Sequence, residues 1–309
     1  ASTYCSEELL SSSTLLQWLQ KPTIATQTAW MIASLTEREE KVVLYLCRHQ
    51  SFPSSLVQTL QNPIAQDQVL PLIQALGNIA CHASLVPALL TQTNPPLIPL
   101  LRQILTQTPS RDKNNPRLLT QAAWLAGCCL VDAGAEGHPS TTVAAPALIP
   151  LLMERLGGGG DRYYGQATAK MTLEEEREFV SALWNALACP PEGSFDNVDP
   201  WAPFDPSRRV PPAQLPFALN VPRPMVQTLT RLLSSNDADA VLASVHVLDL
   251  LLRRRDNEQS SLSSPYLLVM MQEEDLPDAL ERVCDTSMEE SAEIAANLLD
   301  DFFHSEDAP

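Results

Sequence analysis

The amino-acid sequence predicts an all-α fold built from repeated helical units. Two segments, TQTAW from Thr26 and TQAAW from Thr120, nearly duplicate each other and each opens an apolar, Ala-rich stretch. Similar stretches recur along the chain, separated by breaks rich in proline, glycine and polar residues. No segment sustains the alternation of apolar and polar residues that a half-buried strand shows. Together these observations indicate helices that are stacked as repeats.

The near-duplicate segments mark one helix of each repeat. Equivalent positions recur at spacings of 44 to 65 residues, at Trp30, Gln74, Trp124, Trp184, about Asp249 and about Asn297. A second helix type precedes the marker helix and twice carries the motif LIPLL, in which a proline of the first turn removes no intrahelical hydrogen bond. Helices with a period in the forties are typical of armadillo and HEAT arrays. The sequence therefore predicts a right-handed armadillo/HEAT-type α-solenoid superhelix.

We expect residues 1–309 to form a single array of about six repeats. The predicted repeats span about 5–36, 37–83, 84–134, 141–190, 222–256 and 264–303. The two longest spacings contain loop insertions, at about 157–172 and 190–216. The first begins with consecutive glycines, whose backbone entropy disfavours a helix, and the second is rich in proline.

The composition predicts a soluble intracellular protein. Hydrophobic residues make up 45% of the chain, but its apolar runs are far shorter than the roughly 20 residues of a membrane-spanning helix. No signal-peptide pattern is visible. The seven cysteines form no CxxC pair, which favours a reducing compartment over disulfide or zinc chemistry. We expect no cofactor.

The charge balance favours a basic partner. The chain has 37 acidic and 20 basic residues, a net charge of −17 that would repel nucleic acid and anionic membranes. An acidic surface that only maintains solubility is the alternative. The acidic runs 37–40 and 174–176 are expected at helix starts, where carboxylates interact favourably with the helix dipole.

An enzymatic role is not predicted. The sequence has no GxSxG, no HExxH and no Walker lysine after its glycine run, and its five histidines are scattered without ligand spacing. The tryptophans of the repeats have a purely structural alternative, because a single aromatic residue in an amphipathic helix often belongs to the core.

Several motifs resemble importin-α (karyopherin-α), a family of armadillo-repeat proteins. The third helix of its repeats carries Gln-x-x-Trp followed four positions later by a small residue or asparagine. Gln27 with Trp30 and Gln121 with Trp124 match this pattern, and QALGNIA, with Gln74 and Asn78, matches a variant of it. The segment from Ser264 looks like the last repeat of that family. Fewer repeats are visible here than the family has.

The resemblance implies a peptide-binding groove along the third helices. Residues four apart share a helix face, so asparagines can bond the backbone of an extended peptide while tryptophans pack on its Lys and Arg stems. Only one repeat keeps its asparagine, and Arg253 in the fifth would oppose a basic peptide. The candidate cargo-binding residues are Gln27, Trp30, Ser34, Gln74, Asn78, Gln121, Trp124 and Trp184.

The leading hypothesis is a non-enzymatic, nuclear-import-receptor-like adaptor of the cytoplasm and nucleus that binds a basic, extended cargo peptide. The resemblance implies a further partner, an importin-β-like or recycling factor, at the C-terminal repeat. One alternative is a scaffold or dedicated chaperone for a single protein, with the two insertions carrying the contacts. Another is a regulatory subunit whose acidic surface inhibits a basic protein.

Overall fold

The structure, a computed structural model, consists of helices, which confirms the all-α prediction. It describes residues 11–38, 40–48, 51–109, 117–158, 171–188, 213, 215, 217, 219–257, 264–286 and 289–303. The chain divides into two compact units, Ala1–Cys129 and Leu130–Pro309. One continuous array over the whole chain stays a prediction.

The helices of the first unit fall into three groups. Their bounds are α2 (Ser12–Leu19) and α3 (Ala25–Arg38); α4 (Glu40–Cys47), α5 (Ser51–Gln61) and α6 (Val69–Ala80); α7 (Val86–Thr91), α8 (Leu97–Gln107) and α9 (Leu118–Leu130). Short 3₁₀ turns, η1 (Gln66–Gln68) and η2 (Ala83–Leu85), precede α6 and α7. The last helix of each group carries the Trp or Gln marker. We call these last helices the third helices.

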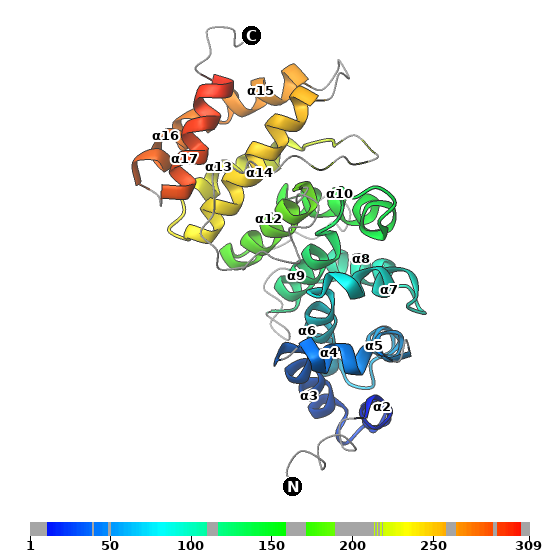
Figure 1. Ribbon diagram of the computed structural model, residues 1–309. Coiled ribbons are helices and arrows are strands. Elements are labelled where there is room, and N and C mark those ends of the chain that lie inside the picture. Colours follow the sequence, from blue (N-terminus) through cyan, green and yellow to red (C-terminus); the bar gives the residue numbers. More distant parts are fainter. Residues whose placement is uncertain are drawn as a thin grey trace. The chain divides into compact units, whose positions relative to one another are not determined.

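In the first unit, corresponding helices of neighbouring groups pack against each other. Helix α2 lies against α5, and α3 lies against α6 (Figure 1). Fully buried side chains such as Leu15, Ile32, Phe52 and Leu72 fill the space between the helices. An apolar face that one repeat cannot bury alone is therefore buried by the next repeat.

The second unit repeats this arrangement. Its helices are α10 (Ala145–Leu156) and α12 (Leu173–Leu187); α13 (Arg223–Leu233) and α14 (Ala238–Asn257); α15 (Ser264–Glu273), α16 (Leu276–Thr286) and α17 (Glu289–Leu298). The segments η3 (Ser140–Ala144) and η4 (Leu299–Phe303) flank them. The third helices α12, α14 and α17 lie side by side in one row, and α10, α13 and α16 form the other (Figure 1).

The two predicted insertions fall between helices. Helix α10 ends at Leu156 and α12 begins at Leu173, which brackets the first; residues 159–170 lie outside the described residues. The second insertion, with Trp201, is described only at its end. There the N–H of Ala213 donates to the Leu187 carbonyl at 2.7 Å. The buried guanidinium of Arg254 donates to the Ala213 carbonyl at 2.8 Å.

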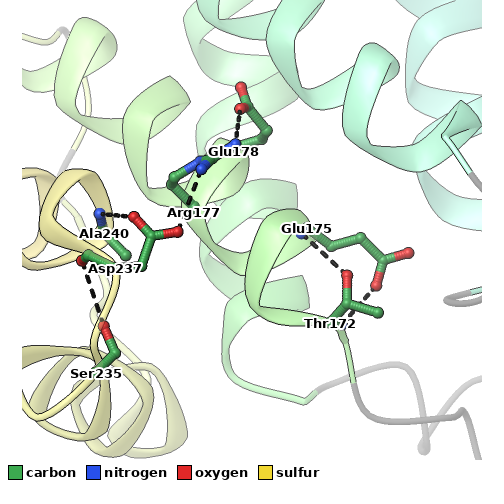
Figure 2. Close-up of polar contacts among 7 residues, drawn as sticks. All are labelled: Thr172, Glu175, Arg177, Glu178, Ser235, Asp237 and Ala240. Atoms are coloured by element: carbon green, nitrogen blue, oxygen red, sulfur yellow. Dashed lines mark hydrogen bonds and ion pairs between the residues drawn. The ribbon is translucent and has the colours of Figure 1, made fainter.

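Two helix starts of the second unit, those of α12 and α14, are capped by side chains (Figure 2). The Thr172 hydroxyl accepts from the N–H of Glu175, whose carboxylate in turn accepts from the Thr172 N–H at 2.7 Å. This reciprocal pair satisfies two backbone donors that a helix start leaves without intrahelical partners. At the start of α14, the carboxylate of Asp237 accepts from the N–H of Ala240 at 3.1 Å. The acidic run 174–176 lies in the first turn of α12, as expected.

Within the described residues, no single helix is long and apolar enough to cross a membrane. One pair of helical segments, Gln66–Ala80 and Ala83–Thr91, is together long and apolar enough, but the pair is bent by 105° at the break between them.

Candidate functional site

The third helices α6 and α9 of the first unit each expose one narrow stripe. In α9, every residue is buried except Gln121 and Trp124. In α6, only Leu70, Gln74 and Asn78 are accessible to solvent. Residues three or four apart lie on one face of a helix, so each set forms a single line along its helix.

Helix α3 exposes a similar line at the spacing that a helix face requires. Its most exposed residues are Gln27, Trp30, Ser34 and Glu37. Glu37 lies in the last turn of α3 rather than at a helix start, because α3 continues through Arg38. We call these accessible residues of α3, α6 and α9 the third-helix stripe: Gln27, Trp30, Ser34, Glu37, Leu70, Gln74, Asn78, Gln121 and Trp124. It contains every cargo-binding residue predicted for this unit.

Asn78 uses its side-chain nitrogen inside the protein. The amide donates to the Ala33 carbonyl at 3.0 Å and to the Thr36 hydroxyl at 3.2 Å. The Thr36 hydroxyl itself donates to the carbonyl of Ala33 at 2.9 Å. The asparagine that the sequence assigned to peptide binding therefore ties α6 to the end of α3.

Trp124 packs directly on the backbone of the neighbouring third helix. A Cβ atom added at Gly77 would lie 2.1 Å from Cζ3 of the Trp124 ring, far inside van der Waals contact. Only glycine leaves room for this ring. The sequence reasoning singled out Gln74 and Asn78 in QALGNIA and missed the glycine, although an isolated glycine within a helical pattern often marks such a close approach.

The three candidate tryptophans differ in exposure. Trp30 is 43% exposed, whereas Trp124 and Trp184 are half-buried. Of the three, Trp30 is therefore the one with the largest open ring surface.

In the second unit, Trp184 of α12 stacks on His246 of α14. The ring centroids are 4.2 Å apart and the planes differ by 7°. His246 is only 7% exposed, and its Nε2 lies 3.7 Å from a carboxylate oxygen of Glu290 on α17. Burial, with a smaller effect of the positive charge of Arg253, lowers the pKa of His246 to about 4. The imidazole is thus neutral at pH 7. It covers one face of the Trp184 ring.

The side chain of Arg253 bonds a residue of its own helix. Its guanidinium bonds the carboxylate of Asp249, one turn earlier, at 2.7 Å. Asp249 is 8% exposed and marks the position equivalent to the tryptophans. The charge that was expected to oppose a basic peptide is therefore offset by a neighbouring carboxylate.

An acidic edge borders α12 and the start of α14. Figure 2 shows Arg177 between Asp237, at 3.2 Å, and Glu178, at 3.4 Å. Burial raises the pKa of Glu178; Arg177 lowers it, and the charges of Glu174 and Asp239 raise it further. Three carboxylates, those of Asp237, Glu178 and Asp239, thus act on the one guanidinium of Arg177, which leaves this edge negative. Among the described residues, no group of three or more His, Cys, Asp or Glu could hold a metal ion.

Solved structures with a similar fold include designed armadillo repeat proteins. One, solved in complex with the peptide (KR)4, is 14% identical to this chain, with a TM-score of 0.59 over 93% of this chain and 97% of that one. Computationally designed armadillo repeat proteins for modular peptide recognition are 15% identical, with a TM-score of 0.61 and the same coverage. These likenesses confirm the armadillo-type fold. No protein-family model and no curated protein matches the chain.

The contact between Gly77 and Trp124 predicts opposite effects of one substitution in two backgrounds. We expect Gly77→Ala to lower the free energy of unfolding by about 1–3 kcal/mol, because the new methyl group overpacks the ring. With Trp124→Ala already present, the same change should stabilise the protein by about 1 kcal/mol through helix propensity. Urea unfolding followed by far-UV circular dichroism measures both. Destabilisation of equal size in both backgrounds would contradict the contact.

The buried His246 predicts a pH-dependent loss of stability. Its pKa is about 4 in the folded protein and 6.5 ordinarily, so between these values the unfolded chain binds more protons and acid favours unfolding. Between pH 7 and pH 5 the free energy of unfolding should fall by about 2 kcal/mol more than in His246→Phe, which keeps the stacked ring but does not titrate. Urea titrations across this range provide the test. Parallel pH profiles for the two proteins would refute it.

Proposed function

We propose that this chain is a non-enzymatic protein that binds an extended polypeptide along the third-helix stripe. The observation that carries the proposal is the burial pattern of α6 and α9. Their apolar faces are almost entirely buried by packing, and the few accessible positions hold three amides, one tryptophan and one leucine rather than the charged residues of an ordinary solvated surface. Amides and aromatics are the side chains that combine backbone hydrogen bonding with apolar contact.

In this proposal, the glutamine side chains form the hydrogen bonds to the backbone of the bound peptide. A glutamine side chain offers two N–H donors and a carbonyl acceptor, which matches the N–H and C=O of an extended peptide. Gln27, Gln74 and Gln121 supply one amide on each of the three third helices. They take the role that the resemblance gave to Asn78, whose nitrogen already bonds α3.

A basic segment fits this stripe best. Trp30 offers an exposed ring to the aliphatic stem of a lysine or arginine, and Glu37 lies two turns further along the same face of α3. The net charge of −17 favours the approach of such a segment. The designed protein that was solved in complex with the peptide (KR)4 shares the fold, which supports this choice of ligand.

At finer detail, we propose a nuclear-import-receptor-like adaptor of the cytoplasm and nucleus, with an importin-β-like or recycling factor at its C-terminal repeat. This rests on the Gln-x-x-Trp motifs and on the segment from Ser264. A scaffold or dedicated chaperone is the second candidate. It is supported by the anchoring of the second insertion, where Arg254 donates to the carbonyls of Ala213 and Leu215.

The first test titrates a fluorescently labelled (Lys-Arg)4 peptide against the protein at low salt. We expect Trp30→Ala to weaken binding roughly tenfold, the loss of about 1.4 kcal/mol that truncation of an aromatic contact residue typically costs. Tyr45→Ala is the matched control, because Tyr45 is also an aromatic residue 43% exposed but lies on α4, which contributes no residue to the stripe. Fluorescence anisotropy gives both dissociation constants.

Two results would count against the proposal. If the parent protein does not bind the peptide at low salt, or if Tyr45→Ala weakens binding as much as Trp30→Ala, the stripe is not the site. A (Ser-Gln)4 peptide tests the preference for a basic ligand separately from the position of the binding site. Equal affinity for this neutral peptide would refute the basic ligand and leave the stripe itself standing.

The second candidate is tested by removing residues 190–212. The hydrogen bond between Ala213 and Leu187 shows that the insertion leaves and rejoins the fold at adjacent points, so a short connection can replace it. We expect unchanged helicity and unchanged affinity for the basic peptide if the stripe is the site. A scaffold that uses this insertion predicts instead that the deletion variant loses partners which the full chain captures.

A further inference from the structure

Two cysteines from different repeats meet beside the third-helix stripe. Cys81 caps the end of α6, one turn after Asn78, and Cys128 lies in α9, one turn after Trp124. Their Sγ atoms are 3.6 Å apart. Cys81 is exposed to solvent, whereas Cys128 is 7% exposed.

We propose that Cys81 and Cys128 form a modification site for small hydroperoxides, which oxidise the pair to a disulfide that joins α6 to α9. The thiols already touch, so the S–S bond of about 2.05 Å requires a shift of about 1.5 Å. Cys81 lies at a helix end followed by a turn, where a small movement of the side chain breaks no helical packing.

The exposed thiol is the one that reacts first. The contact with Cys128 lowers the pKa of Cys81, which increases the fraction of the nucleophilic thiolate, while partial burial opposes this effect. Burial, with a smaller effect of Cys81, raises the pKa of Cys129 to about 12, and burial raises that of Cys47 to about 12 as well. Those two cysteines therefore remain protonated thiols at pH 7.

The reaction proceeds in two steps. The Cys81 thiolate attacks one oxygen of hydrogen peroxide; an S–O bond forms, the O–O bond breaks, and the hydroxide released takes a proton to become water. The sulfur of Cys128 then attacks the sulfenic acid sulfur; the S–S bond forms, the S–O bond breaks, and the departing hydroxide takes the Cys128 proton. Two thiols and one peroxide thus give one disulfide and two waters.

The disulfide would cross-link two neighbouring repeats. It lies one turn from Asn78 and Trp124, the residues that bring α6 into contact with α3 and α9. Formation of the bond does not depend on peptide binding, so its test is independent of the function proposed above.

The test treats the purified, reduced full-length protein with hydrogen peroxide at pH 7, blocks the remaining thiols by alkylation, and digests with trypsin. Cleavage after lysine and arginine places Cys81 in peptide 49–102 and Cys128 in peptide 118–155. We expect mass spectrometry to find these two peptides joined with the loss of two hydrogens, and fragmentation to place the bond at Cys128 rather than Cys129. Dithiothreitol should release them.

Substitutions decide whether this pair is responsible. Cys81→Ser, at an exposed position that tolerates the change, should abolish the joined peptide, as should Cys128→Ser. Cys47→Ser is the matched control and should leave the joined peptide unchanged, because Cys47 lies in α4 with a raised pKa. Intact thiols at Cys81 and Cys128 after peroxide treatment, or a joined peptide that persists in Cys81→Ser, would overturn the proposal.

Discussion

The first unit depends on the burial of every face but one of the third helices α6 and α9. A single repeat cannot enclose these helices, so each needs neighbours on several sides, and what remains open is a line of residues one side chain wide. Helix α9 is the extreme case, with only Gln121 and Trp124 accessible. Any ligand of α6 or α9 in the first unit must use this line, because the other faces of these helices are occupied by the core.

Close packing between third helices uses some of the residues that the line would otherwise present. Asn78 donates its amide to α3, and the ring of Trp124 covers Gly77. In the second unit, Trp184 is stacked on His246 and Arg253 is bonded to Asp249. Asn78, Trp124 and Trp184 therefore hold neighbouring repeats together, whereas Arg253 is bonded within its own helix. The exposed residues of α3 are left as the most open part of the stripe.

The excess of acidic residues is seen around Arg177 as well as in the net charge of the chain. Around Arg177, carboxylates from α12 and from the start of α14 outnumber the single guanidinium. Some of these acidic groups cap helices, as Asp237 does for α14, and thereby stabilise the fold. Carboxylates that cap helices remain available to attract a basic chain, since they stay partly exposed.

The sequence by itself determined the helical class and indicated which residues share one face of a marker helix. Periodicity carries this information, because the spacing of Gln27, Trp30 and Ser34 defines a helix face whatever packs behind it. Only the tertiary structure decided how those side chains are engaged. That Asn78 bonds α3, that Trp124 requires Gly77, and that Cys81 meets Cys128 all depend on the distance and rotation between neighbouring helices. These are set by the packing of many side chains at once, and no spacing within one helix encodes them.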